Sequence, residues 1–335
     1  MQVRRIVYID WLKAFAIFLV LLGHSIQKLS AGGVMDGLFD FIYSFHMPLF
    51  MMLSGFFLVK SLDCGIKRFL ITRSRQLLLP VLSFSVVAFT VSKAIPYLDI
   101  TDGLGFFAYL VGGDMWFLKY LFVCTLIAYL SDRLFRIRFL AAVIPSVLLV
   151  SLSRVGIFRI HPFLWMGYYI HKYEKTIFRH TKWLLPVTVA VFVFLLHFWQ
   201  MKYDTPHFRF VTIKHGISLS WYDLGVVVYR FAIGVFGSLV FLCIFKIIRW
   251  DAVEKRFHAF STFCLNAGRR TLGIYCLQVY LLEDVARCVT LPAHGIVADV
   301  AIVSGVAVAE FIMCNILVGL MEKCRLTRLL FLGQR

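Results

Sequence analysis

Three ionisable residues stand inside the first two apolar segments of this chain. Lys13 and His24 belong to the first segment, residues 6–27, and His46 belongs to the second, residues 38–59. A charged or titratable side chain at membrane depth is costly, so where one persists it usually lines a cavity or a reaction path. An imidazole, with an unperturbed pKa of about 6.5, suits proton transfer near neutral pH. These residues therefore predict acid–base chemistry beside a fixed cation.

The spacing of these residues predicts one shared helix face. Lys13 and His24 are eleven residues apart, which is close to three whole helical turns, or ~16 Å along one face. Asp10 lies one turn before Lys13, at the spacing of a helical ion pair. This face would carry a cation near its inner end and a titratable imidazole near its outer end.

The second segment contains a helix breaker beside its histidine. Pro48 removes a backbone donor, frees the carbonyl of Ser44 and bends the helix next to His46. Ser54 and Gly55 follow, and such small residues favour the close approach of another helix. The sequence thus predicts a bent helix that packs tightly near its end.

The composition places these segments in a helical membrane protein. Of 335 residues, 61% are hydrophobic and 16% are charged, and the mean hydropathy is +0.83. A soluble core does not need so much apolar sequence. The apolar runs lack the alternation of a membrane barrel, so we predict an all-α, polytopic transmembrane bundle that forms a single domain over residues 1–335. About ten spans, each near the ~20 residues that cross the hydrocarbon, are expected at roughly residues 6–27, 38–59, 76–95, 106–130, 139–152, 162–171, 183–200, 224–248, 271–286 and 297–321.

The basic residues predict the orientation of the chain and argue against nucleic-acid binding. Most of the 35 Lys and Arg residues fall in segments on the N-terminal side of the membrane, so the positive-inside rule predicts that both termini are cytoplasmic. The net charge of +17 follows from these loops, which set topology and contact anionic lipid. Lys13, Lys119 and Arg230 fall inside expected spans. The eight cysteines show no CxxC spacing, so no metal site or disulfide framework is expected.

Five sequence motifs together carry a family resemblance. In chain order they are YIDWLKAFAIFLVLLGHS, FHMPLFMMLSGFFL, TRSRQLLLP, MWFLKYL and RRTLGIYCLQ. They resemble the integral-membrane acyltransferase family 3, bacterial O-acyltransferases that modify cell-envelope sugars, and the fucose O-acetylase-like branch is the most similar. Two positions depart from the family pattern: Lys13 replaces the usual arginine, and Gln278 stands where many relatives have histidine. Lysine keeps the charge but loses the planar fork that suits phosphate or carboxylate, and no proton-transfer role is carried over to Gln278.

The resemblance implies an enzyme that moves an acyl group, acetyl by default, from acyl-CoA to a hydroxyl of a cell-envelope sugar or lipid-linked saccharide. It implies that His24 is the general base and that His46 orients the acceptor or donates to the developing oxyanion. Arg73 and Arg75 would meet the CoA phosphates at the cytoplasmic side. The other expected substrate-binding residues are Asp10, Lys13, Trp116 and Tyr275. Acyl-CoA is then a donor substrate rather than a bound cofactor, and the expected location is the bacterial cytoplasmic membrane.

Other interpretations of the same residues remain open. His24 fits an interfacial histidine bonded to a neighbouring helix, His46 fits a partner for freed carbonyls, and Lys13 fits a side chain that snorkels to the headgroups. Arg73 and Arg75 fit ordinary topology charges, since positions two apart in a regular helix point to different faces. The sequence also leaves open whether the acyl group passes directly to the acceptor or first forms a covalent acyl-imidazole.

Two competing function classes also remain. One is a secondary transporter or flippase that moves a sugar, lipid or anion along a polar path, and the other is a non-catalytic receptor or assembly factor. Transporters often contain internal repeats. The sequence contains no convincing repeat, which disfavours the transporter.

Overall fold

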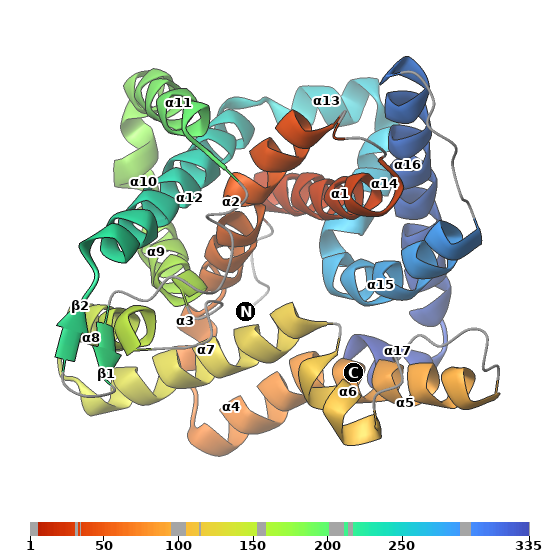
Figure 1. Cartoon of the computed structure of the whole chain (residues 1–335), viewed down its shortest axis with the longest axis horizontal. Coiled ribbons are helices and arrows are strands. Elements are labelled where there is room, and N and C mark those ends of the chain that lie inside the picture. Colours follow the sequence, from red (N-terminus) through yellow and green to blue (C-terminus); the bar gives the residue numbers. More distant parts are fainter. Residues whose placement is uncertain are drawn as a thin grey trace. The chain divides into compact units, whose positions relative to one another are not determined.

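The computed structural model describes residues 6–334 except residues 31–32, 34, 95–104, 114, 153–158, 201–210, 214–216 and 289–295. Across these residues the secondary structure is helical apart from one two-stranded antiparallel hairpin (Figure 1). The chain divides into two compact units. Unit 1 comprises Met1–Leu12, Asp40–Cys64 and Val123–Lys255, and unit 2 comprises Lys13–Phe39, Gly65–Phe122 and Arg256–Arg335. That the whole chain forms a single domain stays a prediction.

Helices α1 (Val7–Leu29), α2 (Asp36–Gly55) and α7 (Trp116–Leu134) have residues in both units, and α13 (Trp250–Arg256) has its last residue in unit 2. Unit 1 also contains α3 (Val59–Leu62), α8 (Arg138–Leu152), α9 (His161–Lys172), α10 (Glu174–Ile177), the 3-10 turn η3 (Phe178–His180), α11 (Thr181–His197), β1 (Val211–Ile213), β2 (Ile217–Leu219), α12 (Trp221–Ile247) and α13 (Trp250–Arg256). Aromatic rings form part of its core. Phe45 of α2 meets Phe192 of α11 edge-on at 5.7 Å between ring centroids and stacks on Phe241 of α12 at 4.7 Å. Phe45 and Phe192 are buried, Phe241 is partly exposed, and the three rings fix α2 against α11 and α12.

Unit 2 contains the remainder of α1 and most of the C-terminal part of the chain. Its other elements are α4 (Ile66–Arg73), the π-helical turn η1 (Ser74–Leu78), α5 (Leu79–Ala94), α6 (Phe106–Gly112), α14 (His258–Arg269), α15 (Thr271–Cys288), α16 (Ile296–Met321) and α17 (Arg325–Leu332). Phe84 of α5 stacks on Tyr280 of α15 at 5.8 Å and meets Phe331 of α17 edge-on at 5.0 Å. Three helices distant in sequence therefore pack around one phenyl ring.

Among the described residues, five helices are long and apolar enough to cross a membrane, and a sixth is added if α6 and α7 form one bent span. The five are Val7–Leu29, Ile66–Ala94, Glu174–His197, Trp221–Ile247 and Val297–Met321. Shorter apolar helices occupy Arg138–Ser151 and Thr271–Leu281. Several membrane-spanning helices are therefore present, whereas the number of about ten spans stays a prediction.

The segment expected as one span over residues 106–130 contains two helices, and the span itself stays a prediction. Two helices, α6 and α7, occupy this segment and meet at a bend of 66°. Gly112 and Gly113 are weak helix formers. Met115 has a φ of 57°, a left-handed conformation that interrupts a right-handed helix. The apolar composition predicted a span here, and its pattern does not reveal the break in the helix.

Candidate active site

Helix α1 presents its three predicted site residues on one face. Asp10, Lys13 and His24 are each partly exposed, although most of this helix is buried. Between Lys13 and His24 on the same face, Ile17 is 1% exposed and Val20 is 4% exposed. This face of α1 is therefore accessible near its two ends and packed in the middle.

His46 is buried, and the backbone of α2 fixes its tautomer. The ring nitrogen Nδ1 lies 2.8 Å from the carbonyl oxygen of Ile42, one turn earlier. Because a carbonyl oxygen only accepts, Nδ1 carries the proton, and in the neutral ring Nε2 is an acceptor. The ring also meets Tyr43 edge-on, with 4.7 Å between the centroids. The imidazole thus bonds to the carbonyl of Ile42, which is not the carbonyl that Pro48 frees.

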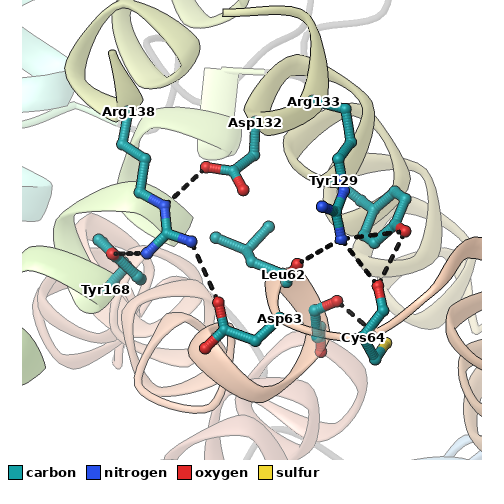
Figure 2. A network of polar contacts seen from close by, with 9 residues as sticks. Leu62, Asp63, Cys64, Tyr129, Asp132, Arg133, Arg138 and Tyr168 are labelled. Carbon is teal, nitrogen blue, oxygen red and sulfur yellow. Dashed lines mark hydrogen bonds and ion pairs between the residues drawn. The ribbon is translucent and has the colours of Figure 1, made fainter. Parts of the chain in front are cut away.

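A guanidinium at the start of α8 holds the segment that follows α2 and α3. Arg138 forms ion pairs with Asp63 at 3.1 Å and Asp132 at 2.9 Å, and it donates to the Tyr168 hydroxyl at 3.0 Å (Figure 2). The planar fork of arginine suits several acceptors at fixed angles. The Arg138 side chain therefore joins the segment after α3 to the end of α7 and to α9.

Arg133 holds the same segment through its backbone (Figure 2). Its Nη2 donates to the carbonyl oxygens of Leu62 at 3.0 Å and Cys64 at 2.9 Å, and the Tyr129 hydroxyl donates to the Cys64 carbonyl at 2.9 Å. A helix leaves its last carbonyls without helical partners, and a cation near the C-terminus satisfies them. The network thus supports the end of α3, the short helix that follows α2.

A second polar cluster, which the sequence did not reveal, holds the first turn of α1. The Tyr8 hydroxyl donates to Glu174 Oε1 at 2.8 Å, and Lys246 Nζ contacts the same oxygen at 2.5 Å. The Lys246 ammonium also lies 4.4 Å from the centre of the Tyr8 ring, a cation–π contact. One signal was available, since Tyr8 opens the first motif two residues before Asp10. The partners of Tyr8 lie far along the chain, so no local pattern names them.

The Arg-x-Arg segment lies where its helix is irregular. Arg73 is the last residue of α4, and Arg75 lies in the π-helical turn η1. Such turns are frequent at functional sites. Both side chains are partly exposed. Arg75 Nε donates to the carbonyl oxygen of Gly333 at 3.3 Å, just after α17, so this guanidinium also supports the C-terminal segment.

Trp116 and Tyr275 come together through Phe117. The backbone N–H of Phe117 donates to the Tyr275 hydroxyl at 3.2 Å, and the two rings meet edge-on at 5.9 Å. Trp116 is the first residue of α7 and is partly exposed, whereas Phe117 is 7% exposed. Two motifs that are far apart in the sequence therefore share one location in unit 2.

Most of the predicted site residues belong to unit 2. That unit holds Lys13, His24, Arg73, Arg75, Trp116 and Tyr275, whereas unit 1 holds Asp10 and His46. Unit 2 therefore contains the proposed base, the proposed donor-binding cations and the Trp116–Tyr275 pair. Their roles in binding and catalysis stay predictions.

Comparison with known proteins identifies curated relatives. The chain is 27% identical over 205 residues to nodulation protein NolL of Mesorhizobium japonicum, and the alignment covers 56% of this chain and 54% of the relative. It is 29% identical over 196 residues to nodulation protein NolL of Sinorhizobium fredii, covering 52% of each. The chain thus spans about half the length of the curated relatives it matches. No solved structure matches the chain.

Comparison with protein families gives a match over nearly the whole chain. The family model of an acyltransferase domain matches residues 6–314. The matched region includes the partly exposed face of α1, the buried histidine of α2 and the Trp116–Tyr275 pair. The protein therefore belongs to acyltransferase family 3, a family of multi-pass membrane acyltransferases.

Proposed function

We propose that this protein is a membrane O-acyltransferase with His24 as general base. It moves an acyl group, acetyl in the simplest case, from acyl-CoA to a hydroxyl of a cell-envelope sugar or lipid-linked saccharide. The observation that carries the proposal is the face of α1 on which Lys13 and His24 are partly exposed while most of the helix is buried. A cation and an imidazole inside a membrane span cost free energy, so their presence favours a functional role.

In the proposed reaction, the His24 imidazole takes up one proton and later releases it. The ring takes the proton of the sugar hydroxyl as the hydroxyl oxygen attacks the thioester carbonyl carbon. The tetrahedral intermediate collapses, the carbon–sulfur bond breaks, and the imidazolium returns the proton to the CoA thiolate. The products are the O-acylated sugar and CoA with a free thiol.

His46 is proposed to orient the acceptor. Because Nδ1 donates to the Ile42 carbonyl, Nε2 of the neutral ring is an acceptor, which suits a hydroxyl of the sugar other than the one that His24 deprotonates. Donation to an oxyanion would instead require a protonated ring. Of the two expected roles of His46, its hydrogen bond favours orientation.

The donor is proposed to arrive from the cytoplasm, the side to which the positive-inside rule assigns both termini. Arg73 and Arg75 would contact the CoA phosphates, and Lys13 would attract the same anion further in. Ile17 and Val20 are packed beyond Lys13, so the pantetheine arm must displace these side chains or pass beside them. The enzyme would then act in the bacterial cytoplasmic membrane.

Acyl transfer by the purified protein separates this function from the alternatives. In lipid nanodiscs, wild-type protein should consume acetyl-CoA and add an acetyl mass to a saccharide acceptor. His24→Ala should abolish the transfer, whereas His258→Ala, which changes an exposed histidine of α14, should not. Movement of a sugar or anion across liposomes without an acyl donor, together with no transfer, would establish a transporter instead.

A further inference from the structure

The break between α6 and α7 combines backbone strain with a cation that the proposed reaction does not use. Met115 has a φ of 57°, which residues with side chains rarely adopt and which persists where surrounding contacts impose it. Met115 is 2% exposed, so the conformation is not that of a surface turn. Lys119 follows one turn later and lies in an apolar segment.

The Lys119 ammonium group donates hydrogen bonds to backbone carbonyls at the end of α6. Its Nζ donates to the carbonyl oxygens of Leu110 at 3.3 Å, Val111 at 3.0 Å and Gly113 at 2.8 Å. The C-terminus of a helix leaves its last carbonyls without helical partners and carries partial negative charge. At membrane depth these groups must be satisfied within the protein, and one ammonium group does this for three of them.

The Tyr275 hydroxyl accepts a hydrogen bond from the backbone at the start of α7. The first N–H groups of a helix lack helical partners, and that of Phe117 donates to the Tyr275 hydroxyl at 3.2 Å. The corner between the helices is also tight, because a Cβ on Gly113 would lie 2.5 Å from the carbonyl oxygen of Tyr109. Side chains from α7 and α15 therefore hold the two sides of the break.

The corner leaves Trp116 accessible. Met115, Phe117 and Leu118 are 2%, 7% and 2% exposed, whereas Trp116 among them is partly exposed. Backbone strain that persists clusters at active sites and ligand-binding positions, and Trp116 is the partly exposed aromatic ring beside this strained residue. An indole offers a flat apolar face and one N–H donor, which match the C–H face and the hydroxyls of a sugar ring.

The expected orientation puts this corner on the acceptor side of the membrane. The positive-inside rule assigns Arg133, at the end of α7, to the cytoplasm, so the start of α7 lies toward the outer surface. Trp116 then lies in the outer half of the membrane. The same rule puts His24, near the end of α1, in the outer half.

We propose that Trp116 contacts the acceptor saccharide and that Lys119 is a positioning residue. Together with Tyr275, Lys119 holds the α6–α7 corner so that the indole faces the acceptor. This inference rests on the proposed acyl transfer and adds a specificity-determining contact to it.

The test measures acetyl transfer in nanodiscs from acetyl-CoA to p-nitrophenyl glycosides of fucose, galactose, glucose and N-acetylglucosamine. Trp116→Ala and Lys119→Met should each raise the KM for the acceptor about tenfold and leave the KM for acetyl-CoA unchanged. Lys119→Arg keeps N–H donors for the carbonyls and should recover most of the acceptor affinity. Lys93→Met, which removes an exposed lysine of α5, is the matched control and should behave as wild type.

A second readout does not depend on activity. Hydroxyl-radical footprinting with mass spectrometry should show a changed rate of Trp116 oxidation in Lys119→Met and no change in Lys93→Met. An unchanged rate in Lys119→Met would overturn the positioning role, whether or not any glycoside is acylated.

The kinetic outcomes separate the two proposals. A fall in kcat alone, or an equal rise in both KM values, would overturn the acceptor contact and leave the proposed function intact. Wild-type protein that neither acylates a glycoside nor releases CoA would overturn the proposed function, and the acceptor contact with it.

Discussion

Gly55 of α2 and Gly167 of α9 bring the backbones of their helices into contact. A Cβ on Gly55 would overlap the carbonyl oxygen of Leu164, and a Cβ on Gly167 would overlap the carbonyl oxygen of Met52. The prediction that Gly55 permits close helix approach is confirmed. Because the atoms in the way belong to the backbone, a larger side chain at either position must push the two helices apart.

Replacing Gly167 by alanine should therefore lower the stability of unit 1. Overpacking of this kind costs about 1–3 kcal/mol, and thermal unfolding in detergent should begin at a lower temperature. Gly225→Ala is the matched control, since a Cβ at this position of α12 meets nothing within 4 Å. That change should leave the midpoint unchanged or raise it, because alanine favours a helix. Equal midpoints for the two variants would contradict the backbone contact.

The cluster of Tyr8, Glu174 and Lys246 at the start of α1 should affect both the stability of the protein and its rate of acyl transfer. Lys246→Met leaves the partly buried Glu174 without its ammonium partner, and it removes the cation–π contact to Tyr8. The expected loss of stability is about 1 kcal/mol, because both side chains remain partly solvated. The rate of acyl transfer should fall as well, because Tyr8 fixes the helix that carries His24.

The control for this cluster is an exposed lysine beside it. Lys175→Met removes a charge from the next position in α10 and should change neither stability nor rate. The double variant Glu174→Gln/Lys246→Met should be less destabilised than the sum of the single variants. Additive effects would show that the two side chains do not interact.

Cys324 should react with alkylating reagents at unusually low pH. This exposed thiol lies at the start of α17, where the backbone N–H groups of Thr327 and Leu326 lower its pKa below the usual range. The thiolate is the reactive form, so a lowered pKa makes the thiolate available at lower pH. Iodoacetamide labelling, followed by mass spectrometry across a pH series, should reach half its maximal rate at a lower pH than in a peptide of residues 320–330. A midpoint at or above that of the peptide would contradict the effect of the helix N-terminus.

The same thiol tests the expected orientation. If the C-terminus is cytoplasmic, a membrane-impermeant maleimide should label Cys324 in inside-out vesicles and leave it unlabelled in sealed right-side-out vesicles. The Cys324→Ser variant measures the maleimide labelling of the other cysteines, which is the background of the experiment. The reverse labelling pattern would place the C-terminus outside the cell and overturn the cytoplasmic entry of the donor.

The sequence predicted the long helices well because their boundaries are local. Apolar runs expected at residues 224–248, 271–286 and 297–321 correspond to α12 (Trp221–Ile247), α15 (Thr271–Cys288) and α16 (Ile296–Met321). Each run ends near charged or polar residues, so hydrophobic pattern alone finds its limits within a few residues. The order of the five motifs also predicted the family, which the family match confirms.

The parts that the sequence did not predict depend on contacts between distant residues. At the break near Met115, Lys119 and Tyr275 bond to the freed backbone groups, and a hydropathy pattern does not reveal such contacts. The contact of Tyr8 with Glu174 joins residues 166 positions apart. The roles of His24 and His46 in catalysis were predicted from residue type and motif, and they stay predictions.

The most direct test of the central claim is the rate of acetyl transfer by His24→Ala. Removal of a general base costs about 10²–10⁴-fold in rate, so the account predicts a loss in that range. The melting temperature should match that of wild type, and His258→Ala should retain full activity. A folded His24→Ala protein that transfers acetyl groups within about threefold of the wild-type rate, well short of the loss expected for a general base, would contradict the account.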